Sequence, residues 1–570
     1  MSMEKRSKDW AIVVLVLVVY YLQRAITFRH GLNYEEGRDA GAYLLFLGGL
    51  LPYRDFEWIY GPFSFAVYPL VMKLFGVNLV VLRAAYLAFA SLIIPLSFFL
   101  ARRIMPGAWA AAAAFLSVLY ITTPYYTYNH VFAVLGELLS LLMFCRIIEA
   151  SRPLPYLILL GLSSSLVMLT KHFLTGISLF ACISLCLLLF GGRSIREKLK
   201  NISIFYATEL AALAAVYSFL WFSAHTTKAC PAHYVINRDS MFFIDQARRA
   251  NPIFMAGIFL DKINNILPLL HLCQLSSWGQ IKQLMAVFYD TSIYIFSLSL
   301  PLIALAGCLF LRRRQQAKAW LTPRIRYIIL YSLFSLFIIA ESAMIHHFHS
   351  RAFNTQLTFI LSLFILYAAS LAFPQRRKIF YSALFILLFY LAFLPFFRYP
   401  CTMLRNYNQR LRLERGGGIF LNRQDRSFYE SLSEYLSARV KGTGAIAVLG
   451  YYPQIAFLSG QRDIFARDEF IFQKFKYLRY LEHRGPAAEL MAVNIEDEIM
   501  RRISNEKPSV ILIVSNNAFG AFRLRHPRVY SFLQGGYRLD RCFGPVDIYG
   551  SGDEPEQVEA YLYNGRSLRR

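Results

Sequence analysis

The stretch that decides the fold is 33–76, NYEEGRDAGAYLLFLGGLLPYRDFEWIYGPFSFAVYPLVMKLFG, because it sets carboxylates directly after a membrane-length apolar run at 10–27. The carboxylates are those of Glu35, Glu36, Asp39, Asp55 and Glu57. Ionisable groups at a membrane face are costly to hold there, so such a cluster indicates a function. The stretch also holds a second apolar segment, 63–75, which is shorter than the roughly 17 residues that a span requires.

The composition of the whole chain is that of a membrane protein. Of its 570 residues, 56% are hydrophobic and 16% are aromatic, a larger apolar share than soluble domains have. The net charge of +25 at first indicates a nucleic-acid partner. However, Lys and Arg lie in short loops between apolar runs, which the positive-inside rule explains without a polyanion. We therefore expect membrane lipids as partners and no nucleic acid.

The basic loops also orient the spans. If 63–75 is an interfacial helix, every strongly basic short loop lies on the cytoplasmic side with the N-terminus, so we predict that arrangement. The predicted spans are then eleven: 10–27, 79–100, 108–122, 132–147, 154–170, 173–190, 202–222, 292–311, 327–343, 353–373 and 380–397. An odd number places the C-terminus outside, together with a long outer loop at 225–287.

The chain divides into two predicted domains. Residues 1–398 form a polytopic α-helical transmembrane domain whose first outer loop is 29–78, and residues 399–570 form a soluble extracytoplasmic α/β domain. In the second domain, helices (425–440, 496–504, 525–533) alternate with strands (445–449, 510–514, 546–549), which is typical of a small α/β fold. The glycine run 416–418 follows no strand and lacks a Walker pattern, so we predict a hinge there.

The first loop resembles that of the GT-C superfamily of membrane glycosyltransferases, of the protein mannosyltransferase and aminoarabinose transferase kind (glycosyltransferase family 39). The resemblance is carried by the acidic pair Glu35-Glu36, the short helix at 44–49, the segments 52–56 and 60–62, and Leu-Phe-Gly at 74–76. The family usually has Asp-Glu where this chain has Glu35-Glu36. Leu-Thr-Lys at 169–171 and the polar segment 346–351 resemble two later segments of the family, so the resemblance extends over residues 1–370.

The resemblance implies a polyprenyl-phosphate-linked sugar as donor and transfer with inversion. Such a reaction requires a carboxylate that takes the proton of the acceptor hydroxyl. Glu35 is the first candidate for this base, Glu36 and Asp39 are the alternates, and Asp55 would orient the acceptor or the base. Glu35, Glu36 and Asp39 also fit a simpler interpretation, as carboxylates favoured by a helix N-terminus.

Further candidates lie in other outer loops of the predicted topology. Cations must stabilise the charge that develops on the leaving phosphate, and the candidates for this role are Lys171, Arg351, His346 and His349. Polar and aromatic residues can hold a sugar or acceptor, and the candidates are Glu57, Trp58, Tyr60, Tyr125 and His130. The histidines have no companion motif of metal-ligand spacing and the eight cysteines form no CxxC pair, so we assign no metal site and no cofactor. A role for a divalent cation is left open.

The sequence thus predicts an inverting glycosyltransferase of the bacterial inner membrane, with its N-terminus cytoplasmic and its C-terminal domain outside. The sugar is a hexosyl or pentosyl group, and the acceptor is a glycolipid, a polysaccharide or a protein. A transporter or flippase of lipid-linked sugars is one alternative, although it would carry ionisable residues at mid-bilayer and inverted repeats. A polysaccharide polymerase or ligase is the other, and would use His225, His233 and Arg238 of the large outer loop.

Overall fold

The computed structural model describes most of the helical part of the chain and much of the C-terminal part. The described residues are 3–32, 34–52, 55–56, 58, 60–121, 128–170, 173–192, 194–223, 301–303, 323–345, 350–372, 374–376, 378–379, 381–383, 385–386, 399–440, 444–449, 453–465, 486–515, 527–546 and 556–563. Several residues of interest from the sequence lie outside this set: Glu57, Tyr125, Lys171, His346, His349 and the loop 225–287.

Long apolar runs form a bundle of helices within the described ranges. The bundle consists of α1 (Met3–Thr27), α4 (Leu79–Ser91), α5 (Ile93–Ala101), α6 (Gly107–Ile121), α7 (Tyr128–Glu149), α8 (Leu154–Met168), α9 (Phe173–Phe190), α10 (Ile195–Ser223), α15 (Pro323–Ile345) and α16 (Ser350–Ala372). Four segments are long and apolar enough to cross a membrane, namely Ser7–Thr27, Leu79–Ala101, Tyr128–Glu149 and Ile195–Ser218, and shorter apolar helices accompany them. Nine of the predicted spans, all except 292–311 and 380–397, fall on bundle helices.

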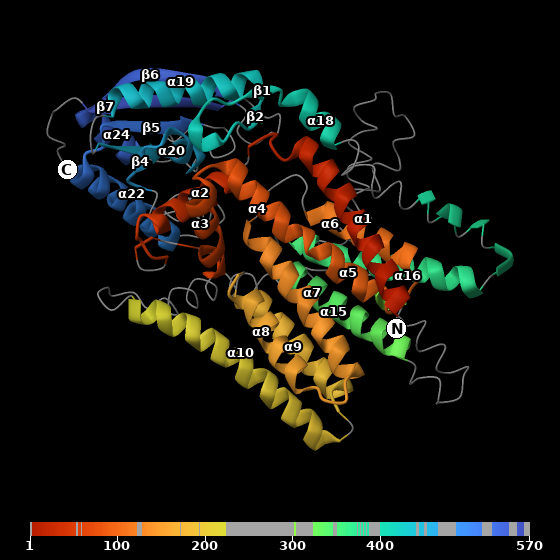
Figure 1. Cartoon of the computed structure of the whole chain (residues 1–570). Helices are drawn as coiled ribbons and strands as arrows, with labels where there is room; N and C mark the ends of the chain where they lie inside the picture. The colour runs from red at the N-terminus through yellow and green to blue at the C-terminus, as the bar shows by residue number, and fades with distance from the viewer. Residues whose placement is uncertain are drawn as a thin grey trace.

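The segment from Tyr399 onward, here called the C-terminal lobe, contains a mixed sheet with helices on both faces (Figure 1). Its helices are α18 (Tyr399–Asn406), η4 (Glu414–Gly416), α19 (Arg423–Arg439), α20 (Pro453–Ser459), α22 (Pro486–Glu506) and α24 (Pro527–Gly536). Its strands are β1 (Gln409–Arg410), β2 (Phe420–Leu421), β3 (Ala445–Leu449), β4 (Arg462–Asp463), β5 (Val510–Ser515), β6 (Tyr537–Val546) and β7 (Glu556–Tyr563). The order in the larger sheet is β4-β3-β5-β7-β6, with β3 parallel to β4 and β5, and β7 antiparallel to β5 and β6.

Alternation along the central strands distributes their side chains between two apolar layers. Ile446 and Val448 of β3 pack in the layer that contains α19, whereas Ala447 and Leu449 pack with α22 and α24. Successive side chains of a strand point to opposite faces, and a strand covered on both faces is apolar throughout. This explains why the pattern AIAVL predicts β3 correctly.

The end of the sheet differs from the prediction. The sequence predicts a last strand at 546–549, but the structure has two long antiparallel strands, β6 and β7, and residues 547–549 lie outside the described set. β6 is an edge strand whose alternation of apolar and polar residues lasts only from Tyr537 to Asp540, because Arg541 places a second charged residue next to Asp540. Two register irregularities interrupt its pairing with β7 and obscure the pattern further.

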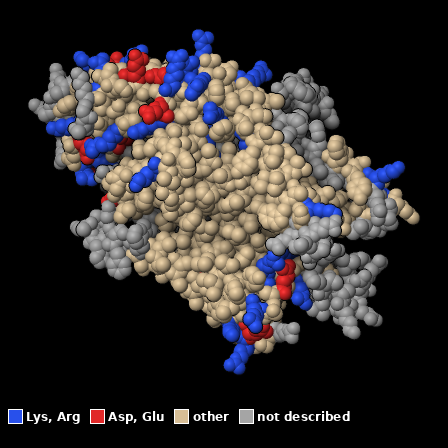
Figure 2. Space-filling model, viewed as in Figure 1, with Lys and Arg blue, Asp and Glu red and all other residues tan. Residues whose placement is uncertain are grey.

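Charged residues are concentrated at the two ends of the helical bundle. Figure 2 shows Lys, Arg, Asp and Glu gathered over the C-terminal lobe and at the opposite ends of the helices, with a largely uncharged band between them. We call the end of the bundle beside the lobe the lobe end, and the opposite end the far end. A broad apolar band between two polar ends is the surface that a bilayer-spanning bundle presents.

The first loop lies at the lobe end. It contains α2 (Tyr34–Leu47) and α3 (Phe63–Phe75). α3 begins where Phe63 N donates to Leu169 O at 2.8 Å, and it ends just before Asn78, which touches Gly417 of the lobe. Because both ends lie beside lobe-end groups, α3 does not cross the bundle. The exposed side chains of Leu74 and Phe75 give its last turn an apolar edge.

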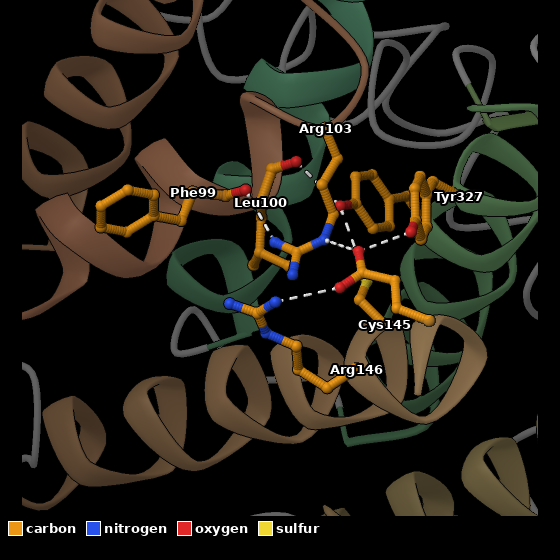
Figure 3. A network of polar contacts seen from close by, with 8 residues as sticks. Phe99, Leu100, Arg103, Cys145, Arg146 and Tyr327 are labelled. Carbon is orange, nitrogen blue, oxygen red and sulfur yellow. Dashed lines mark hydrogen bonds and ion pairs between the residues drawn. The ribbon is translucent and has the colours of Figure 1, made fainter. Parts of the chain in front are cut away.

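A polar network closes the far end of the bundle (Figure 3). Glu149, the last residue of α7, accepts from Arg103 Nε at 3.0 Å and from Arg146 Nη1 at 3.1 Å. The Tyr327 hydroxyl of α15 donates to the same carboxylate at 2.6 Å. One carboxylate thereby joins α7 to α15 and to the turn after α5, and it compensates two of the arginines in this basic region.

The C-terminal lobe is docked on the ends of α1 and α2. Phe420 of β2 exchanges two backbone hydrogen bonds with the residues after α1, as Phe420 N donates to Arg29 O at 2.7 Å and Gly31 N donates to Phe420 O at 2.9 Å. The His30 ring stacks on the Phe420 ring with centroids 5.1 Å apart. On α2, a Cβ at Gly37 would collide with the backbone of Gln454 in α20. The lobe therefore lies directly over the acidic helix.

Candidate active site

Glu36 is held inside the protein by three donors. Its carboxylate accepts from Arg83 Nε at 2.8 Å and Arg83 Nη2 at 2.7 Å, and the Tyr128 hydroxyl lies 3.1 Å from its Oε1. The side chains of Glu36 and Arg83 are each 1% exposed. Arg83 also donates to the carbonyl groups of Phe28 and Gly31. The pair thus joins α2 and α4 to α7 and to the end of α1.

A second ion pair follows on α2. Arg38 Nε donates to Asp39 Oδ1 at 2.8 Å, and both side chains are buried. The Arg38 guanidinium lies over the ring of Tyr60 at 5.1 Å and over that of Trp58 at 5.9 Å, a cation–π arrangement. Tyr60 in turn meets the His130 ring edge-on at 5.9 Å. Arg38 therefore connects the acidic helix to residues that the sequence predicts to bind the sugar or acceptor.

Aromatic side chains enclose the same region. Tyr43 of α2 is fully buried and packs on Phe65 at 5.3 Å and on Trp58 at 6.3 Å between ring centroids. Burial raises the pKa of Tyr43 well above its ordinary value, and the nearby Asp39 carboxylate raises it further. The phenol is therefore protonated at neutral pH and can donate a hydrogen bond.

The first loop is held against the chain that leads into Lys171. Besides the hydrogen bond from Phe63 N to Leu169 O, a Cβ on Gly61 would collide with the Leu169 carbonyl and lie 2.6 Å from Thr170 N. Only glycine permits so close an approach of two backbones. Because Lys171 follows Thr170 directly, the loop that carries the carboxylates adjoins the segment that carries the predicted phosphate-binding lysine.

Asn129 of α7 is a buried polar side chain between Tyr128 and His130. It is 1% exposed, and neither its amide nitrogen nor its amide oxygen has a hydrogen-bond partner among the described residues. Buried amide groups are nearly always hydrogen-bonded. Asn129 therefore has a donor and an acceptor available at the lobe end of α7.

Asp55 closes a turn of the first loop. Its Oδ2 accepts from Leu51 N at 2.8 Å, and its own backbone N–H donates to Leu51 O at 2.9 Å. Trp58 Nε1 donates to Gly61 O at 3.4 Å in the next part of the loop. These bonds give Asp55 a part in shaping the loop, beside the orienting role that the sequence predicts for it.

The structure brings together several of the residues predicted from the sequence. They are Glu36, Asp39, Trp58, Tyr60 and His130, with Asp55 in the adjoining turn. The backbone of Glu35 lies on α2 and that of Arg351 on α16. Glu57, Tyr125, Lys171, His346 and His349 lie outside the described residues, so their predicted roles stay predictions.

Sequence reasoning did not single out Arg38, Arg83 or Tyr43, and it placed Asn129 at the outer face without a role. For Arg83 a signal existed, because a charge inside the apolar run LVVLRAAYLAFAS requires a partner of opposite sign. For Arg38 the signal was its place in a loop that carries five carboxylates. The burial of Tyr43 and Asn129 depends on contacts between distant segments, which no local pattern reveals.

We compared the chain with protein families, curated proteins and solved structures. No protein-family model matches this chain, and no curated protein matches it. The chain is similar to the oligosaccharyltransferase AglB from Archaeoglobus fulgidus in complex with an inhibitory peptide and a dolichol-phosphate, with 12% identity and a TM-score of 0.49 over 97% of this chain and 75% of that one. It is also similar to ArnT from Cupriavidus metallidurans bound to undecaprenyl phosphate, with 13% identity and a TM-score of 0.36 over 96% and 97% of the two chains.

Metal binding was left open by the sequence. Within the described ranges, no group of three or more His, Cys, Asp or Glu side chains could hold a metal ion. The carboxylates of Glu36 and Asp39 are engaged by guanidinium groups, so these two residues do not fit a divalent cation. A structure of the Archaeoglobus fulgidus oligosaccharyltransferase in complex with Zn and sulfate is similar to this chain, with 14% identity and a TM-score of 0.48 over 87% of this chain and 67% of that one.

Proposed function

We propose that this chain is an inverting membrane glycosyltransferase that moves a hexosyl or pentosyl group from a polyprenyl-phosphate donor to a glycolipid, polysaccharide or protein acceptor. The observation that carries the proposal is the contact of the first loop with the segment before Lys171, through Gly61, Phe63 and Leu169. It brings an acidic, aromatic-lined region to the end of an apolar bundle, where the phosphate of a membrane-embedded donor would lie.

Glu35 is the proposed base. Glu36 is saturated by Arg83 and Tyr128, so it cannot take the acceptor proton unless a buried ion pair breaks. Asp39 lies one helical turn from Glu35, on the same side of α2, but it is 1% exposed and its Oδ1 already accepts from Arg38. Glu35 is thus the first candidate, Asp39 is the alternate, and Glu36 positions the helix.

The reaction then proceeds as a single displacement. The acceptor oxygen bonds to the anomeric carbon on the side opposite the phosphate, its proton passes to the carboxylate, and the bond from that carbon to the phosphate oxygen breaks. Lys171 and Arg351, with His346 and His349, would stabilise the departing polyprenyl phosphate. Trp58, Tyr60, Tyr125, His130 and Glu57 would hold the sugar and the acceptor.

The proposal includes an orientation and a location. The N-terminus and the far end of the bundle would be cytoplasmic, because Arg102, Arg103 and Arg146 gather there, as the positive-inside rule requires. The C-terminal lobe would be extracytoplasmic and would cover the site or contact the acceptor. The resemblance of the first loop favours a bacterial inner membrane.

The test is a donor-cleavage assay on the purified full chain. Radiolabelled polyprenyl-phosphate sugars are supplied with candidate acceptors, and release of free polyprenyl phosphate is measured. Lys171→Ala should weaken donor use by roughly 2–5 kcal/mol, the usual scale for a buried charge pair that loses one partner. Lys73→Ala, which removes an exposed lysine on α3, is the control and should behave as the wild type.

Two results would count against the proposal. Movement of intact donor across a vesicle membrane without any cleavage would identify a transporter. Equal donor use by Lys171→Ala and Lys73→Ala would remove Lys171 from the phosphate site.

A further inference from the structure

A pocket of about 620 Å³ opens on the C-terminal lobe, and it shares no residue with the candidate active site. Its lining comes from β1, the turn after it and the first half of α19. The lining residues are Arg410, Leu411, Arg412, Leu413, Glu414, Gly417, Gly418 and Arg426. Three guanidinium groups with one carboxylate in the lining make it a cationic pocket.

Two of these arginines have exposed side chains, although the positive charge of Arg412 also acts on the nearby Glu430 carboxylate. The side chains of Arg410 and Arg412 are exposed, and neither forms an ion pair among the described residues. Arg426, by contrast, is fixed in place, because its Nε lies 3.0 Å from Glu430 Oε1 and its Nη1 donates to Gln409 Oε1 at 3.2 Å. The pocket therefore combines one anchored guanidinium with two that are available to a ligand.

The glycine run 416–418 shapes this pocket. Gly417 and Gly418 have φ values of +63° and +77°, which residues with a side chain rarely adopt. A Cβ on Gly418 would lie 2.9 Å from Arg410 Nε, so glycine lets the Arg410 guanidinium pack across the turn. The run for which the sequence predicts a hinge is a turn packed between Arg410 and α4.

The pocket lies where the bundle meets the lobe. A Cβ on Gly417 would lie 3.1 Å from Val80 Cβ, so the turn rests on the first residues of α4. Asn78 caps that helix, and the membrane-length apolar segment Leu79–Ala101 starts at the next residue. The exposed Leu74 and Phe75 lie just before Asn78. Cations at the start of a membrane-length apolar segment suit a ligand that has an anionic head and an acyl chain.

We propose that this pocket binds the phosphate headgroup of a lipid in the leaflet beside the lobe. Guanidinium groups bind phosphate oxygens in bidentate fashion, and the two available arginines match a phosphomonoester with its several acceptor oxygens. The bound headgroup would tie the lobe to the bilayer surface next to α4. This role does not depend on glycosyl transfer.

The experiment uses the full chain in an uncharged detergent and measures binding of short-chain phosphatidic acid by calorimetry. Short-chain phosphatidylcholine and inorganic phosphate are the comparison ligands. We expect phosphatidic acid to bind at least about tenfold more tightly than either, because only it combines a phosphomonoester with acyl chains. Inorganic phosphate that binds as tightly as phosphatidic acid would overturn the lipid assignment.

Substitutions of the pocket arginines test whether phosphatidic acid binds in this pocket. Arg410→Gln and Arg412→Gln should each weaken phosphatidic acid binding by roughly five- to tenfold, a typical loss for one charge-assisted contact. Because both side chains are exposed and unpaired among the described residues, the fold should tolerate either change, and the melting temperature checks this. Arg423→Gln removes an exposed arginine of α19 outside the pocket and should bind as the wild type does. Unchanged affinity in the Arg410 and Arg412 variants, or an equal loss in Arg423→Gln, would overturn the proposal.

Discussion

Glu36 and Arg83 form a buried ion pair at the lobe end, and the stability of the folded protein depends on both partners. If the Glu36 carboxylate is removed and Arg83 is kept, the Arg83 guanidinium, which is 1% exposed, loses its charged partner. Breaking a buried pair in this way typically costs about 3–5 kcal/mol, whereas replacing both partners with apolar residues is often tolerated.

Glu36→Gln should therefore lower the melting temperature and the yield of folded protein. Thermal unfolding followed by intrinsic fluorescence measures the effect. The double variant Glu36→Met with Arg83→Met should recover part of the loss. Wild-type stability combined with lost turnover in Glu36→Gln would instead make Glu36 a catalytic residue.

Asp463 in β4 predicts a dependence of stability on pH. Burial raises its pKa to about 7, although Val448 N and Phe465 N both donate to its Oδ1 and lower the value. The unfolded chain has a carboxyl pKa near 4, so the folded state binds the proton more tightly. This group favours folding below about pH 4, and its contribution declines as the pH rises to about 7.

Asp463→Asn keeps the acceptor oxygen and removes the ionisation. We expect little change in melting temperature at pH 5 and a gain over the wild type at pH 8. Asp497→Asn, at an exposed carboxylate of the same lobe, is the control and should show no such gain. A wild type that is relatively more stable than Asp463→Asn at pH 8 would contradict the assigned pKa.

At the scale of elements, alanine substitutions at two glycines of α2 test whether α20 of the C-terminal lobe packs on α2. In a helix, alanine is more favourable than glycine by roughly 1 kcal/mol. A glycine-to-alanine substitution should therefore stabilise the protein wherever the added Cβ meets no neighbouring atom. Gly41 is such a position, since a Cβ there would meet nothing within 4 Å. At Gly37 the same Cβ would collide with the Gln454 backbone, which cannot move as a flexible side chain does.

Gly37→Ala should thus loosen the lobe from α2 and lower the melting temperature, whereas Gly41→Ala should keep or raise it. Limited proteolysis of the segment between α19 and α20 reports the docking. If the two variants are cleaved equally and melt alike, α20 does not rest on α2 in solution.

At the scale of the whole molecule, the sequence predicts those helices and strands whose residues must be apolar. A helix in a bilayer pairs its own backbone groups and exposes apolar side chains, so apolar runs of helical length indicate where the bundle helices lie. The buried strands β3 and β5 are recognisable because their residues are apolar on both faces. The edge strand β6 is not, because one of its faces meets solvent and its pairing with β7 is irregular.

The sequence indicates the acidic first loop as the candidate site, but it does not reveal which side chains of that loop form ion pairs. Position along the chain identifies the acidic first loop, yet the partner of Glu36 lies 47 residues away on a bundle helix. Gly61 shows no local sign of its contact with Leu169, because that contact exists only once α3 and α8 pack. Long-range pairing of this kind depends on tertiary packing, which local patterns do not encode.

The central claim, that α2 carries the catalytic base, is tested most directly by single-turnover kinetics of Glu35→Gln in purified full-length protein. The amide keeps shape and hydrogen bonding but cannot accept the acceptor proton. We predict normal stability, near-normal donor binding and a turnover loss of roughly 10²–10⁴-fold, the scale of general-base catalysis, with partial activity in Glu35→Asp. A dead Asp39→Asn beside a fully active Glu35→Gln would move the base one turn along α2. Full activity in Glu35→Gln and Asp39→Asn alike would contradict the claim.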